Sequence, residues 1–202
     1  MRPVSGPARP LSGLAALLGA SSATSRPPRA AVTGITIDSR QVQRGDLYVA
    51  LPGTVTHGAR FCRDAAAAGA AAILTDPTGR DAAVATGLPV LVVPDPRAVL
   101  GRAAAWVYGR PTEHLLVIGV TGTSGKTTTT FLVEAGLRAA GHRTGLVGGI
   151  EIRVGELRRP ATLTTPEATD LQGLFARMRE EGVTAAAMEV SSHALALGRV
   201  DQ

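Results

Sequence analysis

The stretch LLVIGVTGTSGKTTTTFLVEAG, residues 115–136, decides the fold of the C-terminal half of this chain. Its apolar start, Leu115–Val120, is typical of a strand, and a helical pattern follows the loop as far as Ala140. Between them lies a Gly-rich loop with one Lys and several Thr. A strand, a Gly-rich turn and a helix in this order form the usual context of a phosphate-binding loop. We therefore predict an α/β fold here, with a nucleotide site at the loop.

The loop residues supply the groups that phosphate binding requires. The glycines at 122 and 125 let backbone N–H groups turn toward phosphate oxygens, and the next helix adds the positive end of its dipole. Lys126 would reach the β- and γ-phosphates, and the Thr127 hydroxyl would ligate Mg²⁺. The alternative is a plain strand-to-helix turn whose Gly and Thr are only turn and cap residues. The residues predicted to contact ATP are Gly122, Thr123, Ser124, Gly125, Lys126, Thr127 and Thr128.

The distribution of basic residues supports the phosphate assignment of the loop. Lys126 is the only lysine among the 21 Lys and Arg residues, so this chain uses Arg wherever a generic cation is enough. A compact ammonium suits a phosphate loop better than a planar guanidinium. The net charge of +5 would also fit nucleic acid, but the basic residues are scattered without interleaved aromatic ones, so we interpret them as a solvated surface. The loop lacks G-x-G-x-x-G, which argues against NAD or FAD.

Length and composition fit one large or two small domains. The chain has 202 residues, and 45% of them are hydrophobic, which is enough for a core. No apolar run reaches the roughly 18 residues that a membrane span needs. The apolar run Leu11–Ala20 is not followed by a convincing cleavage region, so we expect no signal peptide. The single Cys62 allows no internal disulfide and fits the reducing cytoplasm, where we expect the protein to work.

The N-terminal part predicts a short helix followed by an α/β unit. We expect residues 1–33 to contain a helix at Leu11–Leu18 and a flexible stretch as far as Arg29. From residue 34 to 110, strand and helix patterns alternate, and we expect a linker at 109–111. The expected strands are 35–37, 46–51, 71–75 and 88–93, and the expected helices are 58–70 and 95–109.

The C-terminal part, residues 111–202, predicts a second α/β unit. After the loop and its helix we expect a strand within 141–149, a hairpin over 150–160 that turns at Gly155-Glu156, a helix over 166–182 and a buried strand over 183–190. Alternating strands and helices predict a parallel sheet with helices on both faces. Because so few strands make an unstable domain of this kind, we expect the 202 residues to be the front part of a longer protein.

Four stretches resemble one protein family. GVTGTSGKTTTT is similar to the ATP loop of the Mur ligases, with Val120 where the common G-x-x-x-x-G-K-[ST] motif has its first Gly and Ser124 where the family usually has Asn. ITIDSRQVQRGDLYVALPG (35–53) resembles the UDP-binding domain that the MurE and MurF types share. TTPEATDL (164–171) and MEVSSHALALGRVD (188–201) resemble motifs of the MurE type. The resemblance covers residues 34–202.

This resemblance implies a small N-terminal α/β UDP-binding domain (34–110), followed by the first part of a P-loop-type parallel-sheet ATP-binding domain (111–202). The implied activity is ATP-dependent carboxylate–amine ligation, which adds diaminopimelate or lysine to UDP-MurNAc-L-Ala-D-Glu through an acyl phosphate in peptidoglycan synthesis. The implied cofactors are ATP and Mg²⁺. The implied partners are UDP-MurNAc-dipeptide and a diamino acid, with a monomeric protein, no nucleic acid and no membrane insertion. The family's later segments are absent, so we expect the 202 residues alone to be inactive.

The resemblance also assigns roles to individual residues, beside which simpler alternatives stay open. Lys126 and Glu189 are the implied catalytic residues, and Thr127 and Glu189 the implied metal ligands. The residues implied to hold the UDP-muropeptide are Ile37, Ser39, Thr164, Thr165, Ser191 and Arg199. The alternatives are a surface-facing Glu189, a turn at Asp38-Ser39, helix caps at Thr164-Thr165 and at Ser191-Ser192, and a solvated cation at Arg199.

Two other functions remain open at this point. One is another carboxylate–amine ligase of the superfamily, of the MurF or folylpolyglutamate type. The stretch DSR…GDLYVALPG argues against the folate branch, and MEVSSHAL argues against the MurF type. The other is a truncated, non-catalytic homologue that binds a nucleotide or a UDP-muropeptide.

Overall fold

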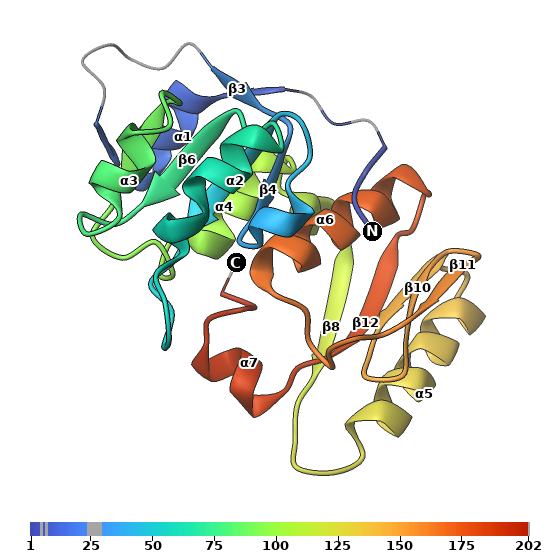
Figure 1. Ribbon diagram of the computed structural model, residues 1–202. Helices are drawn as coiled ribbons and strands as arrows, with labels where there is room; N and C mark the ends of the chain where they lie inside the picture. The colour runs from blue at the N-terminus through green and yellow to red at the C-terminus, as the bar shows by residue number, and fades with distance from the viewer. Residues whose placement is uncertain (5, 7, 24–29, 202) are drawn as a thin grey trace. The chain divides into compact units, whose positions relative to one another are not determined.

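The computed structural model describes residues 1–4, 6, 8–23 and 30–201, and the chain divides into two compact units. Residues 5–108 form the N-terminal unit, and residues 109–202 with residues 1–4 form the C-terminal unit. Each unit has its own five-stranded sheet with helices packed against it (Figure 1). The expected α/β class is therefore confirmed.

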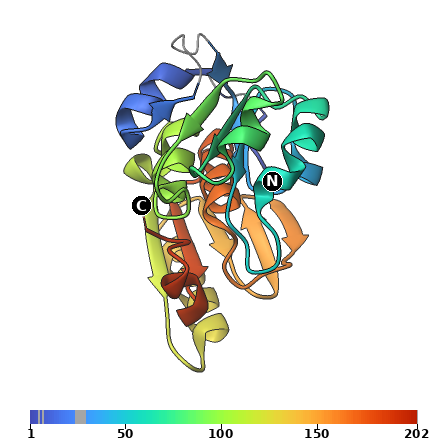
Figure 2. The same cartoon turned by 60° about the vertical axis from the view of Figure 1, so that its left-hand side comes forward.

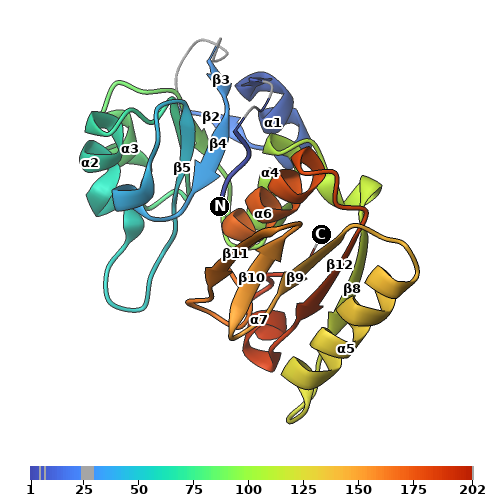
Figure 3. The ribbon, with the colours of Figure 1, turned by 90° about the vertical axis from the view of Figure 1, so that its right-hand side faces the viewer.

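The N-terminal unit is a three-layer α/β structure. Its strand order is β2 (Ser21–Ser22), β7 (Val90–Val92), β6 (Ala72–Thr75), β5 (Asp46–Ala50) and β4 (Gly34–Thr36). All pairs are parallel except β2 with β7. The helices are α1 (Leu11–Leu18), α2 (Cys62–Ala67), α3 (Arg80–Val84) and α4 (Leu100–Val107). Every residue of β5 is buried because α2 and α3 cover one face of the sheet and α1 and α4 cover the other (Figure 3).

Shorter elements complete this unit. They are the two-residue strands β1 (Arg9–Pro10) and β3 (Ala31–Val32), which pair with each other, and the 3₁₀ turns η1 (Ser39–Gln41) and η2 (Gly58–Phe61). Tyr48, Cys62 and Ile73 belong to the core between the sheet and the α2 and α3 layer. The turns η1 and η2 follow β4 and β5, so they lie beyond the carboxyl ends of two adjacent strands.

The C-terminal unit has a mixed sheet between two long helices. Its strand order is β11 (Leu157–Pro160), β10 (Glu151–Val154), β9 (Thr144–Val147), β12 (Ala185–Glu189) and β8 (Leu116–Val120). The helical elements are η3 (Pro111–His114), α5 (Lys126–Ala139), α6 (Ala168–Glu180) and α7 (Ser192–Ala196). Helices α5 and α6 lie on opposite faces of the sheet (Figure 3). Leu171, Phe175 and Met178 of α6 form the main core with Val147 and Met188.

The expectation of a parallel sheet is only partly correct. Strands β8, β9 and β12 are parallel, but β10 and β11 continue the sheet as an antiparallel hairpin that turns at Gly155 (Figures 1 and 2). The connections β9–β10 and β10–β11 are a few residues long, whereas a parallel connection needs a dozen or more residues. Short connections therefore force antiparallel pairing here.

Several expected helices begin later than their sequence pattern suggests. The helix expected over 95–109 begins at Leu100, because Asp95 first accepts the N–H groups of Arg97 and Ala98 in a turn. The helix expected over 166–182 is α6, which begins at Ala168 and ends at Glu180. Gly182 follows it in the left-handed conformation, with φ 71°, that often ends a helix.

The remaining differences concern short elements. The helix expected over 58–70 is divided into η2 and α2. Helix α3 was not expected, because its five residues are too few to show a period. Strand β2 lies in the stretch that we expected to be flexible, where it pairs with β7. Residues 24–29 of that stretch are outside the described residues.

Glu134 connects α5 to the sheet. It is 3% exposed, accepts the hydroxyl of Thr144 on β9, and pairs with Arg138 and Arg153. The guanidinium of Arg153, on β10, lies 4.9 Å from the ring centroid of Phe131, on α5. Leaving a buried charge without its partner is strongly destabilising. The cluster therefore holds the helix that follows the Gly-rich loop.

Glu134→Ala should lower the free energy of local unfolding of α5 by about 2 kcal/mol, because the half-buried Arg153 loses one of its two partner carboxylates and the buried Thr144 hydroxyl loses its acceptor. Hydrogen–deuterium exchange of the α5 amides measures this loss. Glu113→Ala is the matched control: Arg110 and Glu113 are 52% and 58% exposed, so their pair should contribute less than about 1 kcal/mol. Equal losses in the two variants would show that Glu134 does not stabilise α5.

Candidate functional site

The loop between β8 and α5 leaves its backbone accessible at a helix start. Residues 121–125 are exposed. Gly122 has φ 149° and Gly125 has φ 80°, which side chains rarely adopt, so both positions require glycine. Gly125 is the N-cap position of α5, and no side chain of the described residues caps this helix. Lys126 donates from Nζ to the Gly122 carbonyl at 2.7 Å, so its ammonium lies back over the loop.

Glu189 lies beside this loop at the carboxyl end of β12. It pairs in register with Val120, the last residue of β8, so the loop and Glu189 leave adjacent strands at the same edge. Glu189 Oε2 accepts the Thr127 hydroxyl at 3.0 Å, and Oε1 accepts the Gly149 N–H at 2.9 Å. A Cβ on Gly148 would lie 2.7 Å from Oε1, so a side chain there would displace the carboxylate. Glu189 is 2% exposed, and the surface-facing alternative is therefore wrong.

The Thr165 hydroxyl joins the segment before α6 to the end of β12. Thr165 is 1% exposed; its Oγ1 donates to the Glu189 carbonyl at 2.9 Å and accepts the Ser191 N–H at 3.0 Å. Arg199 donates from one guanidinium nitrogen to the Thr165 carbonyl at 3.2 Å, and its other terminal nitrogen pairs with Glu167 at 2.7 Å. The predicted residues Thr165, Ser191 and Arg199 therefore form one connected cluster.

The structure tests the simpler alternatives for Ser191, Arg199 and Thr164-Thr165. Ser191 Oγ accepts the Ala194 N–H at 3.1 Å, so Ser191 does cap α7. The Arg199 side chain is only 14% exposed, so it is not a solvated cation. The N-cap residue of α6 is Glu167, so the cap alternative for Thr164-Thr165 is wrong.

The remaining residues that the sequence predicted for this unit lie near the Gly-rich loop or near the segment after β9. Thr164 is half-buried, and a Cβ on Gly149 would lie 3.3 Å from its hydroxyl. The exposed residues among those predicted to contact ATP, besides the glycines, are Thr123, Ser124 and Thr128. The Gly149 N–H was not predicted, because a backbone donor carries no signal in the sequence.

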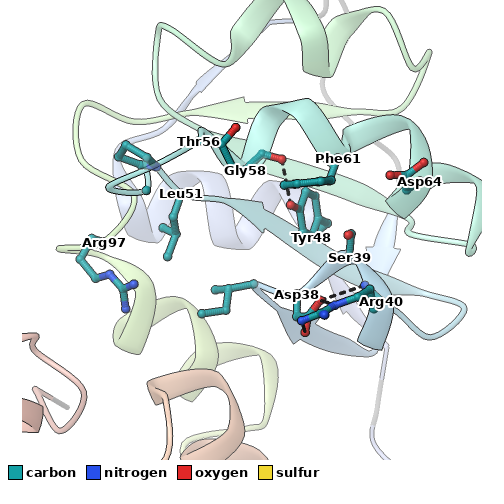
Figure 4. Close-up of a pocket in the computed structure, with 13 residues that line it drawn as sticks. Asp38, Ser39, Arg40, Tyr48, Leu51, Thr56, Gly58, Phe61, Asp64 and Arg97 are labelled. Atoms are coloured by element: carbon teal, nitrogen blue, oxygen red, sulfur yellow. Dashed lines mark hydrogen bonds and ion pairs between the residues drawn. The ribbon is translucent and has the colours of Figure 1, made fainter.

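The N-terminal unit has a separate pocket of about 730 Å³ (Figure 4). It contains both residues of this unit that the sequence predicted, Ile37 and Ser39. The full lining is Ile37, Asp38, Ser39, Arg40, Tyr48, Leu51, Pro52, Gly53, Thr56, Gly58, Phe61, Asp64 and Arg97. The aromatic rings of Tyr48 and Phe61 were not predicted, because in sequence they follow the ordinary pattern of core residues.

Asp38 and Arg40 partly neutralise each other at the pocket edge. Two guanidinium nitrogens of Arg40 donate to the carboxylate at 2.9 and 2.8 Å, and the Arg40 N–H donates to Oδ1 at 3.0 Å. The Arg40 guanidinium holds the pKa of Asp38 below its usual value. Asp38 therefore forms the turn that the simpler alternative predicted, and this turn presents Ser39 to the pocket.

His57, which does not line the pocket, bridges two segments. Its Nδ1 accepts the Ala59 N–H at 2.9 Å, and its Nε2 lies 3.1 and 3.2 Å from the two carboxylate oxygens of Asp76. Asp76 also accepts the Thr78 hydroxyl and the Gly79 N–H, both at 2.8 Å. Burial raises the pKa of Asp76, but the bonds from Gly79, Thr78 and His57 outweigh burial and hold it below its usual value.

The lowered pKa of Asp76 predicts a pH dependence of stability. A carboxyl group whose pKa is lower in the folded state stabilises the fold above its unfolded-state pKa and loses this contribution as the pH falls through the folded-state pKa. The free energy of unfolding of wild type should therefore exceed that of Asp76→Asn at pH 6, with the difference shrinking below about pH 4. Urea unfolding followed by the fluorescence of Trp106, which lies in this unit, measures it. A pH-independent difference would contradict the assignment.

Thr165→Val should destabilise the cluster by about 2 kcal/mol, because the Glu189 carbonyl and the Ser191 N–H both lose their buried partner. Hydrogen exchange at the Ser191 amide should accelerate accordingly, whereas Thr165→Ser keeps the hydroxyl and should exchange nearly as slowly as wild type. Slow exchange in Thr165→Val would mean that the bridge does not stabilise the cluster.

Comparison with known proteins agrees with this arrangement. Residues 31–108 match the model described as Mur ligase family, catalytic domain, and residues 120–202 match the model described as Mur ligase middle domain. A curated relative from Streptomyces avermitilis, UDP-N-acetylmuramoyl-L-alanyl-D-glutamate--2,6-diaminopimelate ligase, is 61% identical over 201 residues. The match covers 99% of this chain and 39% of the relative, so the chain spans less than half of the relative's length.

Solved structures agree on the fold. A UDP-N-acetylmuramoyl-L-alanyl-D-glutamate--2,6-diaminopimelate ligase has a TM-score of 0.70 at 28% identity, covering 88% of this chain and 35% of that one. The MurF ligase from Thermotoga maritima in complex with ADP has a TM-score of 0.52 at 22% identity, covering 80% of this chain and 32% of that one. Within the described residues, no helix has the length and apolar character that crossing a bilayer requires. Matched in both units to Mur ligase models, this chain belongs to the Mur ligase family.

Proposed function

We propose that this chain is part of an ATP-dependent ligase of the MurE type, which joins diaminopimelate to UDP-MurNAc-L-Ala-D-Glu in peptidoglycan synthesis. The observation that carries the proposal is the 3.0 Å contact between Thr127 on the Gly-rich loop and the buried Glu189. It occurs in a chain 61% identical to a diaminopimelate ligase. That identity favours diaminopimelate over lysine, and a MurE-type enzyme over a MurF or folylpolyglutamate type.

The loop and its surroundings fit a magnesium nucleotide. The oxygens of Thr127 and Glu189 are of the hydroxyl and carboxylate kinds that Mg²⁺ accepts as ligands. One carboxylate beside the phosphate loop suits Mg²⁺, because this ion usually takes one or two carboxylates and completes its shell with phosphates and water. When bound, Mg²⁺ would neutralise charge on the transferring phosphoryl group.

The chain's own residues would act mainly by position and charge. The backbone N–H groups of residues 122–126 would hold the phosphates, and Lys126 would exchange its contact with the Gly122 carbonyl for phosphate oxygens. The γ-phosphoryl group would pass to the substrate carboxylate with release of ADP. An amine would then attack the acyl carbon, and inorganic phosphate would leave as the amide forms.

The roles of the substrate residues follow from their surroundings. In the N-terminal unit, Ile37 and Ser39 would contact the uridine portion in the 730 Å³ pocket. In the C-terminal unit, Thr164, Thr165, Ser191 and Arg199 would line the approach of the acidic muropeptide. Because Thr165 and Ser191 bond to each other and Arg199 bonds to the Thr165 carbonyl and Glu167, we assign these three mainly to shaping this approach. We assign Thr164 to substrate contact.

Further features of the proposal concern the whole protein. We propose a UDP-binding domain over 34–110, an ATP-binding domain that begins at 111, a monomeric state and a cytoplasmic location. A non-catalytic homologue that only binds a nucleotide is the second candidate, and the loss of turnover described below separates it from the ligase.

In a ligase that contains this chain, Lys126→Ala should lower turnover by about 10³-fold, because the cation that would stabilise the transferring phosphoryl group is lost. Binding of UDP-MurNAc-dipeptide should persist, since the pocket of the N-terminal unit is not altered. Release of inorganic phosphate and calorimetric titration measure the two quantities.

Arg158→Ala is the matched control, because it removes an exposed cation from the β10–β11 hairpin of the same unit rather than from the loop. It should leave turnover within about twofold of wild type. Full turnover in Lys126→Ala would remove the ATP role, and absence of turnover in the unaltered protein with all substrates present would favour the non-catalytic candidate.

A further inference from the structure

The segment between β5 and η2 forms one wall of the pocket in the N-terminal unit. Pro52, Gly53, Thr56 and Gly58 line the cavity, whereas His57, between the last two, does not. Its imidazole bonds instead to Asp76, which does not line the cavity either. We propose that His57 is a positioning residue for the nucleotide pocket, which holds residues 52–58 in the shape that receives a uridine diphosphate group. This inference rests on the proposed function of the pocket.

The hydrogen bonds of His57 fix its tautomer. A backbone N–H can only donate, so the Nδ1 that faces the Ala59 N–H at 2.9 Å carries the lone pair. Nε2 therefore carries the proton and donates to Asp76. Only the neutral imidazole protonated on Nε2 makes both contacts at once. An asparagine at this position can make the first contact as an N-cap residue, but it is too short to make the second.

Asp76 gives the bridge a rigid base. It follows β6 directly, is 8% exposed, and is held by the Thr78 hydroxyl and the Gly79 N–H. A Cβ on Gly79 would lie 2.8 Å from His57 Cε1, so a glycine is needed where the ring passes. The imidazole thus connects the pocket wall to the end of a core strand 19 positions away in sequence.

Among the described residues, the other hydrogen bonds of this wall hold its two ends. The Tyr48 hydroxyl donates to the Gly58 carbonyl at 2.9 Å, and the Gly58 N–H donates to the Leu51 carbonyl at 2.8 Å. Between these ends Val55 is 96% exposed, so packing does not fix the middle of the wall. A Cβ on Gly53 would lie 2.5 Å from the Thr56 carbonyl oxygen, so this turn is tight. Through its bond to Asp76, His57 connects the chain next to Thr56 to the end of β6.

A wall that is already ordered improves binding because the ligand does not have to order it. Removing the bond from Nε2 to Asp76 should therefore weaken binding of UDP without removing any atom that lines the cavity. A role confined to stability would lower the unfolding temperature and leave the affinity of the folded protein unchanged. Affinity measured well below the unfolding temperature separates these two roles.

The test is calorimetric titration with UDP of a ligase that contains this chain, and of its variants. His57→Asn keeps the contact to Ala59 and loses Asp76, and it should weaken binding about 10-fold. Asp76→Asn keeps one acceptor for Nε2 and should weaken binding about threefold. His142→Asn is the matched control: the His142 imidazole contacts the Thr184 hydroxyl in the C-terminal unit, and its loss should not change affinity. In wild type, ¹⁵N spectra of the imidazole should show the neutral form protonated on Nε2.

The outcomes separate the inference from the proposed function. UDP binding to wild type and to His57→Asn with equal affinity would overturn the positioning role and leave the uridine assignment standing. Failure of UDP to bind wild type would overturn the uridine assignment and the inference with it. If His57→Asn does not fold, Asp76→Asn decides: the weakening given above supports the inference, and wild-type affinity overturns it.

Discussion

The buried carboxylate of Glu189 is the constraint on which the C-terminal unit depends. It accepts the Thr127 hydroxyl from the first turn of α5 and the Gly149 N–H from the segment after β9, so one side chain connects three neighbouring strand ends. A carboxylate with 2% exposure is stable only while such partners surround it. The same negative charge that organises these segments would attract a divalent cation. Structural order and metal affinity therefore depend on the same group.

Glu134, Arg199 and Thr165 hold the segments around Glu189 in place without contacting its carboxylate. Glu134 anchors the second half of α5 to β9 and β10, and the helix start is thereby held against β12. Thr165, in the segment before α6, bonds to the Glu189 carbonyl, and Arg199 bonds to the Thr165 carbonyl. The loop at 121–125 is exposed, so its conformation depends on two fixed ends and two glycines rather than on packing.

The sequence predicted features that depend on neighbouring residues and missed those that depend on distant ones. Strand β8, the loop and α5 follow from local period and glycine positions, and the hairpin turn at Gly155 follows in the same way. The buried position of Glu189 could be predicted from its place at the end of an apolar strand. The His57–Asp76 bridge and the contact from Gly149 had no local signal, because each joins segments whose proximity exists only after the sheets form.

Both units place their polar side chains by the same rule, although their sheets differ in strand order. In the N-terminal unit the pocket wall, η1 and Asp76 follow the carboxyl ends of β5, β4 and β6. In the C-terminal unit the loop, Gly149 and Ser191 follow β8, β9 and β12. Parallel neighbours bring segments that are distant in sequence to one edge, where free backbone N–H groups and helix starts gather. Each unit then needs one buried carboxylate at that edge to fix the segments. Asp76 does so through His57, and Glu189 does so directly.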